Sequence, residues 1–386
     1  MSTTFADLGL AEPIVTALES RGITEPFPIQ AMSIPDAITG RDVCGKAKTG
    51  SGKTFAFGLP VLHQLEKAEA QRPHALALVP TRELAVQVHD ELSPIADLLD
   101  RTVAAIYGGA DIEKQIKKLQ RGVDFIVATP GRLIDLIERK EVSLDDVKHV
   151  IVDEADRMAD MGFMPQVEWL LRHVPGEHQT LLFSATLDGV VDRLISRYQN
   201  DPARFEVESA TTTVDSMQHR FLLVHEMDRA KVVAAIARDA HRTLAFSRTK
   251  HGADRLARAV NDAGVEAAAI HGDLRQKSRE RALKEFADGE IELLVATDVA
   301  ARGIHVDDVD VVIHYQPASD HKSYLHRSGR TARAGNSGVA VTLSLWNEEL
   351  EVKRLQKRLG LEQPIVEMFS NDERLADLGG WDPHAD

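Results

Sequence analysis

Short apolar runs alternate with segments of helical period along the chain, and this alternation constrains the fold more than any other feature. The runs cover 75–79, 103–106, 125–128, 150–152 and 180–183, and then 220–224, 243–246, 267–270, 293–296, 309–313 and 339–343. Runs this short and apolar are typical of strands buried on both faces of a parallel sheet. Segments 84–99, 230–239 and 253–263 have the period of crossover helices. The pattern predicts an α/β protein with two sheets, each mostly parallel and flanked by helices.

The length supports a division into two domains, since 386 residues at about 150 per domain make two to three. The apolar pattern breaks at 209–215, where the residues are typical of a linker. We therefore expect an N-terminal domain over 1–208, a linker over 209–215 and a C-terminal domain over 216–361. The last segment, 362–386, has seven acids and one arginine, and we expect a solvated acidic tail there.

Composition excludes several classes of protein. The 46 Lys and Arg against 60 Asp and Glu leave a net charge of −14, which argues against a broadly basic nucleic-acid coat but not against a narrow basic track. A single cysteine, Cys44, excludes an intramolecular disulfide and suits a reducing compartment. No apolar stretch reaches the roughly 18 residues of a membrane span, and residues 1–10 lack secretory features. We expect a cytoplasmic protein without membrane contact.

A glycine-rich loop lies between a strand-like segment at 42–44 and a helical one at 55–65. Its sequence, AKTGSGKT at 47–54, is typical of a phosphate loop, in which backbone N–H groups and a helix N-terminus surround phosphate oxygens. In that role Lys53 reaches the β- and γ-phosphates and the Thr54 hydroxyl binds Mg²⁺. The general pattern has glycine where this chain has Ala47, and an ordinary glycine-rich turn is the alternative. The predicted nucleotide contacts in the loop are Thr49, Gly50, Ser51, Gly52, Lys53 and Thr54.

The run 150–152 leads directly into Asp-Glu-Ala-Asp at 153–156. Acids at the carboxyl end of a buried strand lie where open α/β sheets bind their ligands. One carboxylate there can hold Mg²⁺ through water, and a second can deprotonate an attacking water. We assign Asp153 to the metal and Glu154 to the base. A solvated acidic turn is the alternative, and the presence of Lys53 and Thr54 makes it much weaker.

Asp-Glu-Ala-Asp is the signature of the DEAD-box family of ATP-dependent RNA helicases, and further elements of that family follow in order from Phe5 to about residue 338. The chain resembles a core-only and bacterial member. The resemblance implies two tandem RecA-like domains, ATP and Mg²⁺ as cofactors, and RNA as the partner of a monomeric core. It also implies that the Thr54 hydroxyl and Asp153 hold Mg²⁺ largely through water and the ATP phosphates.

The segment GITEPFPIQ at 22–30 resembles the family's adenine-reading Q element. The resemblance implies that Gln30 hydrogen-bonds the adenine edge, because a carboxamide can donate and accept at once. It also implies that Phe5 stacks on the adenine, although a packing role at a helix start would explain Phe5 as well. Phe27 stands where the family more often has threonine.

Three loops in the first half resemble the family's RNA-backbone elements: PTRELA at 80–85, Gly-Gly at 108–109 and TPGR at 129–132. Hydroxyls, guanidinium groups and exposed glycine N–H groups bind phosphates without base preference. Taken one at a time, each loop fits a helix cap or turn as well. The predicted RNA contacts here are Pro80, Thr81, Arg82, Gly109, Thr129 and Arg132. The resemblance further assigns coupling of hydrolysis to strand separation to Asp156, Ser184, Thr186 and His326.

The second half has two further elements, ATDVAARGIH at 296–305 and HRSGRTARAG at 326–335. The resemblance implies that Gly303 contacts nucleotide and that Arg330 and Arg333 act as arginine fingers, which we predict on one side of a helical turn. His305, Ser328 and Ala332 depart from the Asp, Ile and Gly common in the family. The predicted RNA contacts of this half are Arg248, Gln276, Arg279, Thr297 and Asp298.

The arrangement divides one active site between two domains, with Lys53 and Asp153 in the first and Arg330 in the second. We expect RNA-stimulated ATP hydrolysis, domain closure on the RNA backbone, and local, non-processive unwinding. An ATP-gated RNA clamp or platform with little unwinding and a DNA-directed helicase are the alternatives. Few cationic residues serve the backbone, so we also expect modest affinity with a shallow salt dependence. Backbone contacts carry no base information, so the sequence names neither an RNA nor a pathway.

Overall fold

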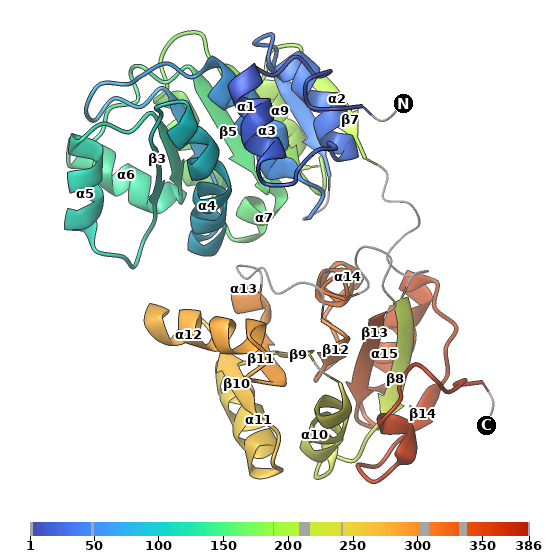
Figure 1. Cartoon of the computed structure of the whole chain (residues 1–386). Coiled ribbons are helices and arrows are strands. Elements are labelled where there is room, and N and C mark those ends of the chain that lie inside the picture. The colour runs from blue at the N-terminus through green and yellow to red at the C-terminus, as the bar shows by residue number, and fades with distance from the viewer. Residues whose placement is uncertain are drawn as a thin grey trace. The chain divides into compact units, whose positions relative to one another are not determined.

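The computed structural model describes residues 3–47, 50–187, 189–207, 217–240, 242–301, 309–331 and 338–384, without the side chains of Gln276, Val299, Ala301 and Lys322. The chain divides into two compact units, Met1–Ser209 and Ala210–Asp386 (Figure 1). The predicted linker at 209–215 lies outside the described residues. Each unit is described below by itself.

The first unit is built on a seven-stranded sheet in the order β3-β4-β2-β5-β6-β1-β7, with parallel pairing throughout. Its strands are β1 (Val43–Lys46), β2 (Ala75–Leu78), β3 (Val103–Ile106), β4 (Phe125–Ala128), β5 (His149–Asp153), β6 (Gln179–Ser184) and β7 (Ala203–Glu206). Its helices are α1 (Glu12–Glu19), α2 (Pro28–Ala37), α3 (Lys53–Gln64), α4 (Arg82–Leu98), α5 (Ile112–Gln120), α6 (Pro130–Glu138), α7 (Ala155–Asp160), α8 (Met164–Arg172) and α9 (Val190–Tyr198).

Both faces of this sheet are buried, which is why its strands are nearly continuous apolar runs. Alternate strand residues point to opposite faces, so Ala75 and Ala77 of β2 pack with α1–α4 while Leu76 and Leu78 pack with α5–α9. Figure 1 shows α5 and α6 beside β3, at one end of this sheet. The predicted parallel sheet flanked by helices is confirmed for this unit.

The second unit repeats the plan with a seven-stranded sheet in the order β10-β11-β9-β12-β13-β8-β14, again parallel. Its strands are β8 (Met217–Leu223), β9 (Thr243–Ser247), β10 (Ala267–Ile270), β11 (Leu293–Thr297), β12 (Val311–His314), β13 (Gly338–Ser344) and β14 (Ile365–Glu367). Its helices are α10 (Arg229–Asp239), α11 (Lys250–Asp262), α12 (Gln276–Ala287), α13 (Asp298–Ala301), α14 (His321–Ser328) and α15 (Glu349–Leu359), with a 3₁₀ turn, η1, at Glu373–Leu375.

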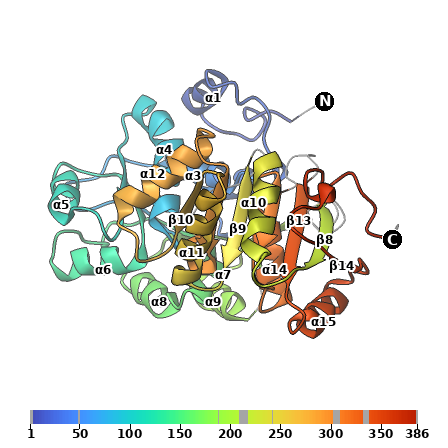
Figure 2. The same cartoon turned by 90° about the horizontal axis from the view of Figure 1, so that it is seen from below.

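The two faces of the second sheet have separate cores. Helices α10 and α11 pack on one face, where the cluster includes Val233, Leu256 and Ile313. On the other face α12 packs through Phe286, and α14 and α15 pack on Phe221 of β8 through Tyr324 and Leu355. Figure 2 shows α15 close to the β8 and β14 end of this sheet.

The C-terminal segment differs from the expected solvated tail. Strand β14 pairs with β8, and Met368, Leu375 and Leu378 are buried in the core of the second unit. The guanidinium of Arg220 donates to the backbone oxygens of Leu378 and Trp381 at 2.8 and 3.0 Å. Among the described acids of this segment all but the half-buried Asp372 are exposed, while its few apolar residues anchor it in the core, so counting charges alone gave the wrong answer.

Two edge strands, β7 and β14, have no counterpart among the predicted runs. Both contain charged residues and are partly exposed, so neither has the continuous apolar run of a strand that is buried on both faces. Among the helices that the structure describes, none is both long and apolar enough to cross a membrane.

Candidate active site

The carboxyl ends of the parallel strands meet at one edge of the first sheet, where open α/β sheets bind ligands. The strand order β3-β4-β2-β5-β6-β1 places six loops side by side along this edge. The three loops predicted to contact RNA follow β3, β4 and β2, and the acidic and phosphate loops follow β5 and β1. Strand order therefore separates the predicted RNA contacts from the predicted nucleotide contacts along a single edge.

The phosphate loop connects β1 to the first residue of α3, Lys53. Ala47 extends the ladder by donating its N–H to the oxygen of Ser184 at 2.9 Å, and its φ is not positive, so the position does not require the glycine of the general pattern. Lys53 is 7% exposed, and its Nζ donates to the Ala47 oxygen at 3.2 Å and lies 3.8 Å from Asp153 Oδ1. Thr54 is half-buried at the start of α3, and Thr49 lies outside the described residues.

Gly52 requires glycine for two reasons. Its φ is +85°, and a Cβ there would lie 2.5 Å from Gln30 Nε2 and 2.8 Å from Phe27 Cδ2. Gln30 Nε2 donates to the Gly52 oxygen at 2.8 Å, and Gln30 Oε1 accepts from the Phe27 N–H at 2.8 Å. The Gln30 carboxamide therefore ties the start of α2 to the phosphate loop, and these two bonds use one of its two amide hydrogens and one lone pair of its oxygen.

Phe5 is a buried core residue in this structure. Its ring is 2% exposed and belongs to the hydrophobic core on the α1–α4 face of the sheet. It lies seven residues before α1, so it is not a helix-start staple either. The exposed aromatic ring beside Gln30 is Phe27, at 56% exposure. A base stacks on an open aromatic face, and in this structure Phe27 has such a face and Phe5 does not.

Asp153 ends β5 and is 3% exposed. Its Oδ1 accepts from the Glu154 N–H at 2.8 Å and faces Lys53. Burial raises the pKa of Asp153 to about 6, against the opposing effect of the Lys53 ammonium. Strand β5 therefore presents a desolvated carboxyl group next to the predicted phosphate-binding lysine.

Glu154 adopts the left-handed conformation, with φ 51° and ψ 49°, before α7 begins at Ala155. Such a conformation is unfavourable for a residue other than glycine, and strained residues cluster at functional sites. The Glu154 side chain is buried, and its Oε2 accepts from Arg157 Nη1 at 2.6 Å. Sequence inspection passed over Arg157, because nothing in its local pattern separates it from an ordinary helix-surface arginine.

The loop after β6 contacts the acidic loop. Ser184 is fully buried at the end of β6, and its Oγ accepts from the Asp156 N–H at 3.1 Å. Thr186 follows two residues later and is half-buried. The predicted coupling residues Ser184 and Asp156 are thus in direct contact.

The loops after β2 and β3 also meet. Thr81 caps α4 by accepting from the Leu84 N–H at 3.3 Å, which is the helix-cap alternative for this residue. Arg82 follows it, and a Cβ on Gly109 would lie 2.4 Å from Arg82 Nη1, with φ +80° at that glycine. Gly109 therefore makes room for the guanidinium of Arg82. Pro80 is buried beside them.

The loop after β4 joins the same group. Thr129 is half-buried at the start of α6 and makes no side-chain cap hydrogen bond. Arg132 Nη1 and Nη2 both donate to the Ala110 oxygen at 3.3 Å, and its Nε lies 3.9 Å from Asp135. The structure thus brings together Arg82, Gly109 and Arg132, which come from three separate crossovers.

In the second unit, Arg248 and Arg279, which are predicted to contact RNA, form hydrogen bonds to other groups of the protein. Arg248 follows β9 and donates to the Pro317 oxygen at 2.9 Å and to Glu351 at 3.3 Å. Arg279 on α12 donates to the Ala300 oxygen at 3.0 Å. Thr297 is buried at the end of β11. Gln276 begins α12, and its side chain is not among those described.

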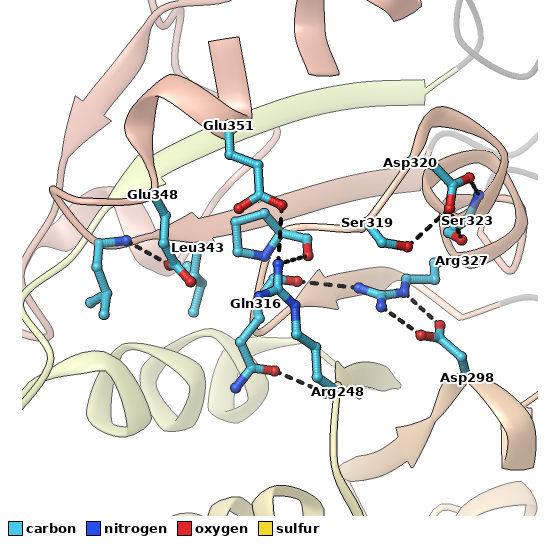
Figure 3. A network of polar contacts seen from close by, with 12 residues as sticks. Arg248, Asp298, Gln316, Ser319, Asp320, Ser323, Arg327, Leu343, Glu348 and Glu351 are labelled. Carbon is cyan, nitrogen blue, oxygen red and sulfur yellow. Dashed lines mark hydrogen bonds and ion pairs between the residues drawn. The ribbon is translucent and has the colours of Figure 1, made fainter. Parts of the chain in front are cut away.

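Asp298 and Arg327 form a two-pronged ion pair (Figure 3). Both guanidinium–carboxylate distances are 2.7 Å, and Arg327 also donates to the Gln316 oxygen at 3.2 Å. The side chain of Arg327 is only 3% exposed, so this pair fixes α14 to the end of β11. Sequence inspection missed Arg327 because its partner lies 29 residues away and no local pattern joins the two.

The arginine-finger segment differs from the predicted helical turn. Helix α14 ends at Ser328, with Gly329 as its C-cap, so Arg330 lies beyond the helix and is half-buried. His326 lies on α14 and is exposed. Arg333 and Gly303 lie outside the described residues, as do His305 and Ala332. The prediction of a helical turn is therefore wrong at Arg330.

Comparison with known proteins identifies related sequences over most of the chain. The DEAD/DEAH box helicase family model matches residues 27–194, and the helicase conserved C-terminal domain model matches residues 227–335. The chain is 44% identical to the DEAD-box ATP-dependent RNA helicase CshA of Geobacillus kaustophilus, over 97% of this chain and 82% of the relative. It is 41% identical to CshA of Bacillus subtilis, over 97% of this chain and 76% of the relative.

Solved structures agree with these matches. The structure of S. cerevisiae Dbp5 bound to RNA and ADP BeF3 aligns with a TM-score of 0.84 and 28% identity, covering 98% of both chains. A DEAD box protein from Methanococcus jannaschii aligns with a TM-score of 0.53 and 34% identity, covering 95% of this chain and 100% of the other. These neighbours confirm the tandem RecA-like fold.

Proposed function

The chain belongs to the DEAD-box family of ATP-dependent RNA helicases, and on that premise we propose that it hydrolyses ATP in response to RNA and opens short duplexes locally. As a member of this family it is an ATP hydrolase that acts on RNA. The observation that supports the finer proposal is the edge of the first sheet, where one row of loops contains both the predicted nucleotide contacts and the predicted RNA contacts of this unit. Contact between Ser184 and Asp156 supports a coupling between them.

The nucleotide end of the edge supplies the catalytic groups. We assign Lys53 to the β- and γ-phosphates, with the backbone of Thr49–Gly52 around them, and Glu154 to deprotonation of the attacking water. Gln30 reads the adenine with its remaining donor and acceptor positions. The same proposal keeps Gly303 at the nucleotide and Thr186 and His326 in the coupling. For Phe5, stacking would require its ring to leave the core.

A divalent ion fits the groups at this end. Among the described residues no group of three or more histidine, cysteine or acidic side chains is arranged to hold a metal ion. The Asp153 carboxylate and the Thr54 hydroxyl are hard oxygen donors, which Mg²⁺ prefers while it keeps several waters and phosphate oxygens. We propose that these two residues hold Mg²⁺ with the ATP phosphates. When bound, the ion would neutralise phosphate charge.

The titration of Asp153 predicts how Mg-ATP binding depends on pH. Its pKa lies near 6, so this carboxyl group becomes neutral as the pH falls through that value and loses its attraction for a cation. Between pH 7 and 5, calorimetric Mg-ATP affinity should therefore fall by about tenfold. The Asp153→Asn variant binds more weakly at pH 7 and should show only the pH dependence of ATP itself. Parallel pH profiles for the two proteins would contradict the assignment.

The other end of the edge supports RNA binding through the backbone. Arg82, Gly109 and Arg132 lie together there, and guanidinium and backbone N–H groups bind phosphate without reading bases. Thr81 and Thr129 add hydroxyls in the same loops, and Pro80 shapes the first of them. In the second unit we propose Arg248, Gln276, Arg279 and Thr297 as further contacts. Asp298 contributes indirectly, because its carboxylate holds Arg327.

Closure of the two units is the proposed mechanical step. Lys53 and Glu154 belong to the first unit and Arg330 and Arg333 to the second, so one complete site needs both. ATP and RNA that each favour the closed state must help each other to bind. A strand clamped and bent by both units cannot stay in a regular duplex, which gives local and non-processive opening.

The test is ATP turnover with and without RNA, beside strand displacement on a short duplex. We expect single-stranded RNA to raise kcat at saturating ATP and to lower the ATP KM, because the ligands share the closed state. Single-stranded DNA of the same sequence is the control. Turnover that is independent of RNA, or equal stimulation by DNA, would overturn the proposal. RNA-stimulated turnover without displacement would instead identify an ATP-gated clamp.

A further inference from the structure

A row of side chains crosses the second sheet beneath α14. Strand register places Phe246, His314, Thr342 and Phe221 side by side on β9, β12, β13 and β8. All four are buried. Two of them, His314 and Thr342, are polar, and both are 0% exposed. Polar groups at such positions need hydrogen-bond partners, since burial without one is costly.

Helix α14 packs on this row through Tyr324, Arg327 and Ser328, which share one helix face at positions i, i+3 and i+4. The ring of Tyr324 stacks on that of His314 with centroids 4.5 Å apart. The guanidinium carbon of Arg327 lies 5.3 Å from the centroid of the Phe246 ring. All three docking residues are nearly inaccessible to solvent.

At the end of α14, Ser328 forms a hydrogen bond to His314, a member of this row. Ser328 Oγ lies 3.0 Å from His314 Nε2, and both residues are 0% exposed. Burial lowers the pKa of His314 well below its usual value, so the imidazole is neutral and suited to a hydroxyl partner. Tyr324 makes a second such contact, its hydroxyl lying 2.7 Å from His219 Nδ1. Ser328 stands where the family commonly has isoleucine, and its hydroxyl has a buried hydrogen-bond partner in His314.

Arg330 follows the end of α14 closely. Its N–H donates to the Arg327 oxygen at 3.2 Å, and its oxygen accepts from the Val309 N–H at 3.3 Å. A shift at Ser328 is therefore transmitted to Arg330 through two peptide units. We propose that His314 and Ser328 form a buried positioning pair that sets the place of Arg330 during ATP hydrolysis. This inference rests on the catalytic role proposed for Arg330.

A double-mutant cycle on the full chain tests the pair. Ser328→Ala removes the hydroxyl, His314→Phe keeps a ring for Tyr324 without nitrogen atoms, and the double variant leaves neither polar group unpaired. At a temperature where circular dichroism shows all four proteins folded, each single change should lower kcat about tenfold and change the ATP KM by less than about twofold. The double variant should recover kcat to within about threefold of the parent.

Ser323→Ala is the matched control, because Ser323 Oγ bonds Asp320 at 2.9 Å at the other end of α14. It should leave kcat unchanged. The positioning role is overturned if Ser328→Ala keeps normal kcat, if the double variant is no better than the worse single one, or if Ser323→Ala is equally impaired.

Amide hydrogen exchange over residues 321–331 tests the contact between His314 and Ser328 independently of the catalytic role proposed for Arg330. Faster exchange in each single variant, with recovery in the double variant, supports the pair. If Arg330→Ala then retained full turnover, the proposed function of Arg330 would fail while the pair itself stood. Additive exchange effects would overturn the pair whatever Arg330→Ala did.

Discussion

Arg330→Ala lowers RNA-stimulated ATP turnover by about 10³- to 10⁵-fold, the range known for arginine fingers. The guanidinium fork stabilises the charge that spreads over the transferring phosphoryl group, a role that we propose for Arg330 together with Arg333. Steady-state phosphate release at saturating ATP and RNA measures the effect. Arg330→Lys should recover little of the loss, because an ammonium carries the charge without the two-pronged geometry.

A matched control for Arg330→Ala is available on α12. Arg281 pairs with Glu285 one helical turn away, and its side chain is 78% exposed. Arg281→Ala removes the same charge from the same unit and should keep turnover within about twofold, as surface substitutions usually do. Retention of more than about a tenth of parental turnover by folded Arg330→Ala would contradict the assigned role.

Glu154→Gln lowers turnover by about 10²- to 10⁴-fold, the usual contribution of general acid–base catalysis. The amide keeps the size of the side chain and an oxygen for Arg157, which now lies 2.6 Å away, but it cannot take a proton from water. Nucleotide binding should survive, because Lys53 and the phosphate loop are untouched. Fluorescent-nucleotide titration beside single-turnover hydrolysis separates the two properties.

Asp160→Asn is the control for Glu154→Gln. Asp160 is an exposed acid at the end of α7, the helix that Glu154 precedes, and its amide should leave hydrolysis unchanged. If Glu154→Gln bound nucleotide and hydrolysed it at the parental rate, Glu154 would not be the base. Loss of binding in parallel with hydrolysis would identify it as a structural residue of the acidic loop.

Local patterns determined the elements and the chemistry. Apolar runs of three to five residues predicted most of the strands, and glycine spacing followed by Lys53 predicted a phosphate loop before a helix. These two patterns can be recognised in the sequence because each depends on residues that are adjacent in the chain. The edge strands β7 and β14 were not predicted, because each contains charged residues and is partly exposed.

Charge was the least reliable sequence signal. A net charge of −14 argued against a broadly basic coat but could not locate a narrow basic track, and Arg82 and Arg132 lie in loops along one sheet edge. The same counting made 362–386 a solvated tail, whereas Met368 and Leu378 anchor it in the core. A net charge sums over the surface and so contains no information on position.

The sequence by itself thus determined two α/β halves, a phosphate loop and an acidic loop, because local spacing specifies each of them. Only the tertiary structure decided which residues meet: Ser184 with Asp156, Arg82 with Gly109, and Asp298 with Arg327. Only the tertiary structure shows that Phe5 is buried and that α14 ends before Arg330. Such contacts join segments tens of residues apart, and the order of the strands in the sheet, which no local pattern encodes, sets them side by side.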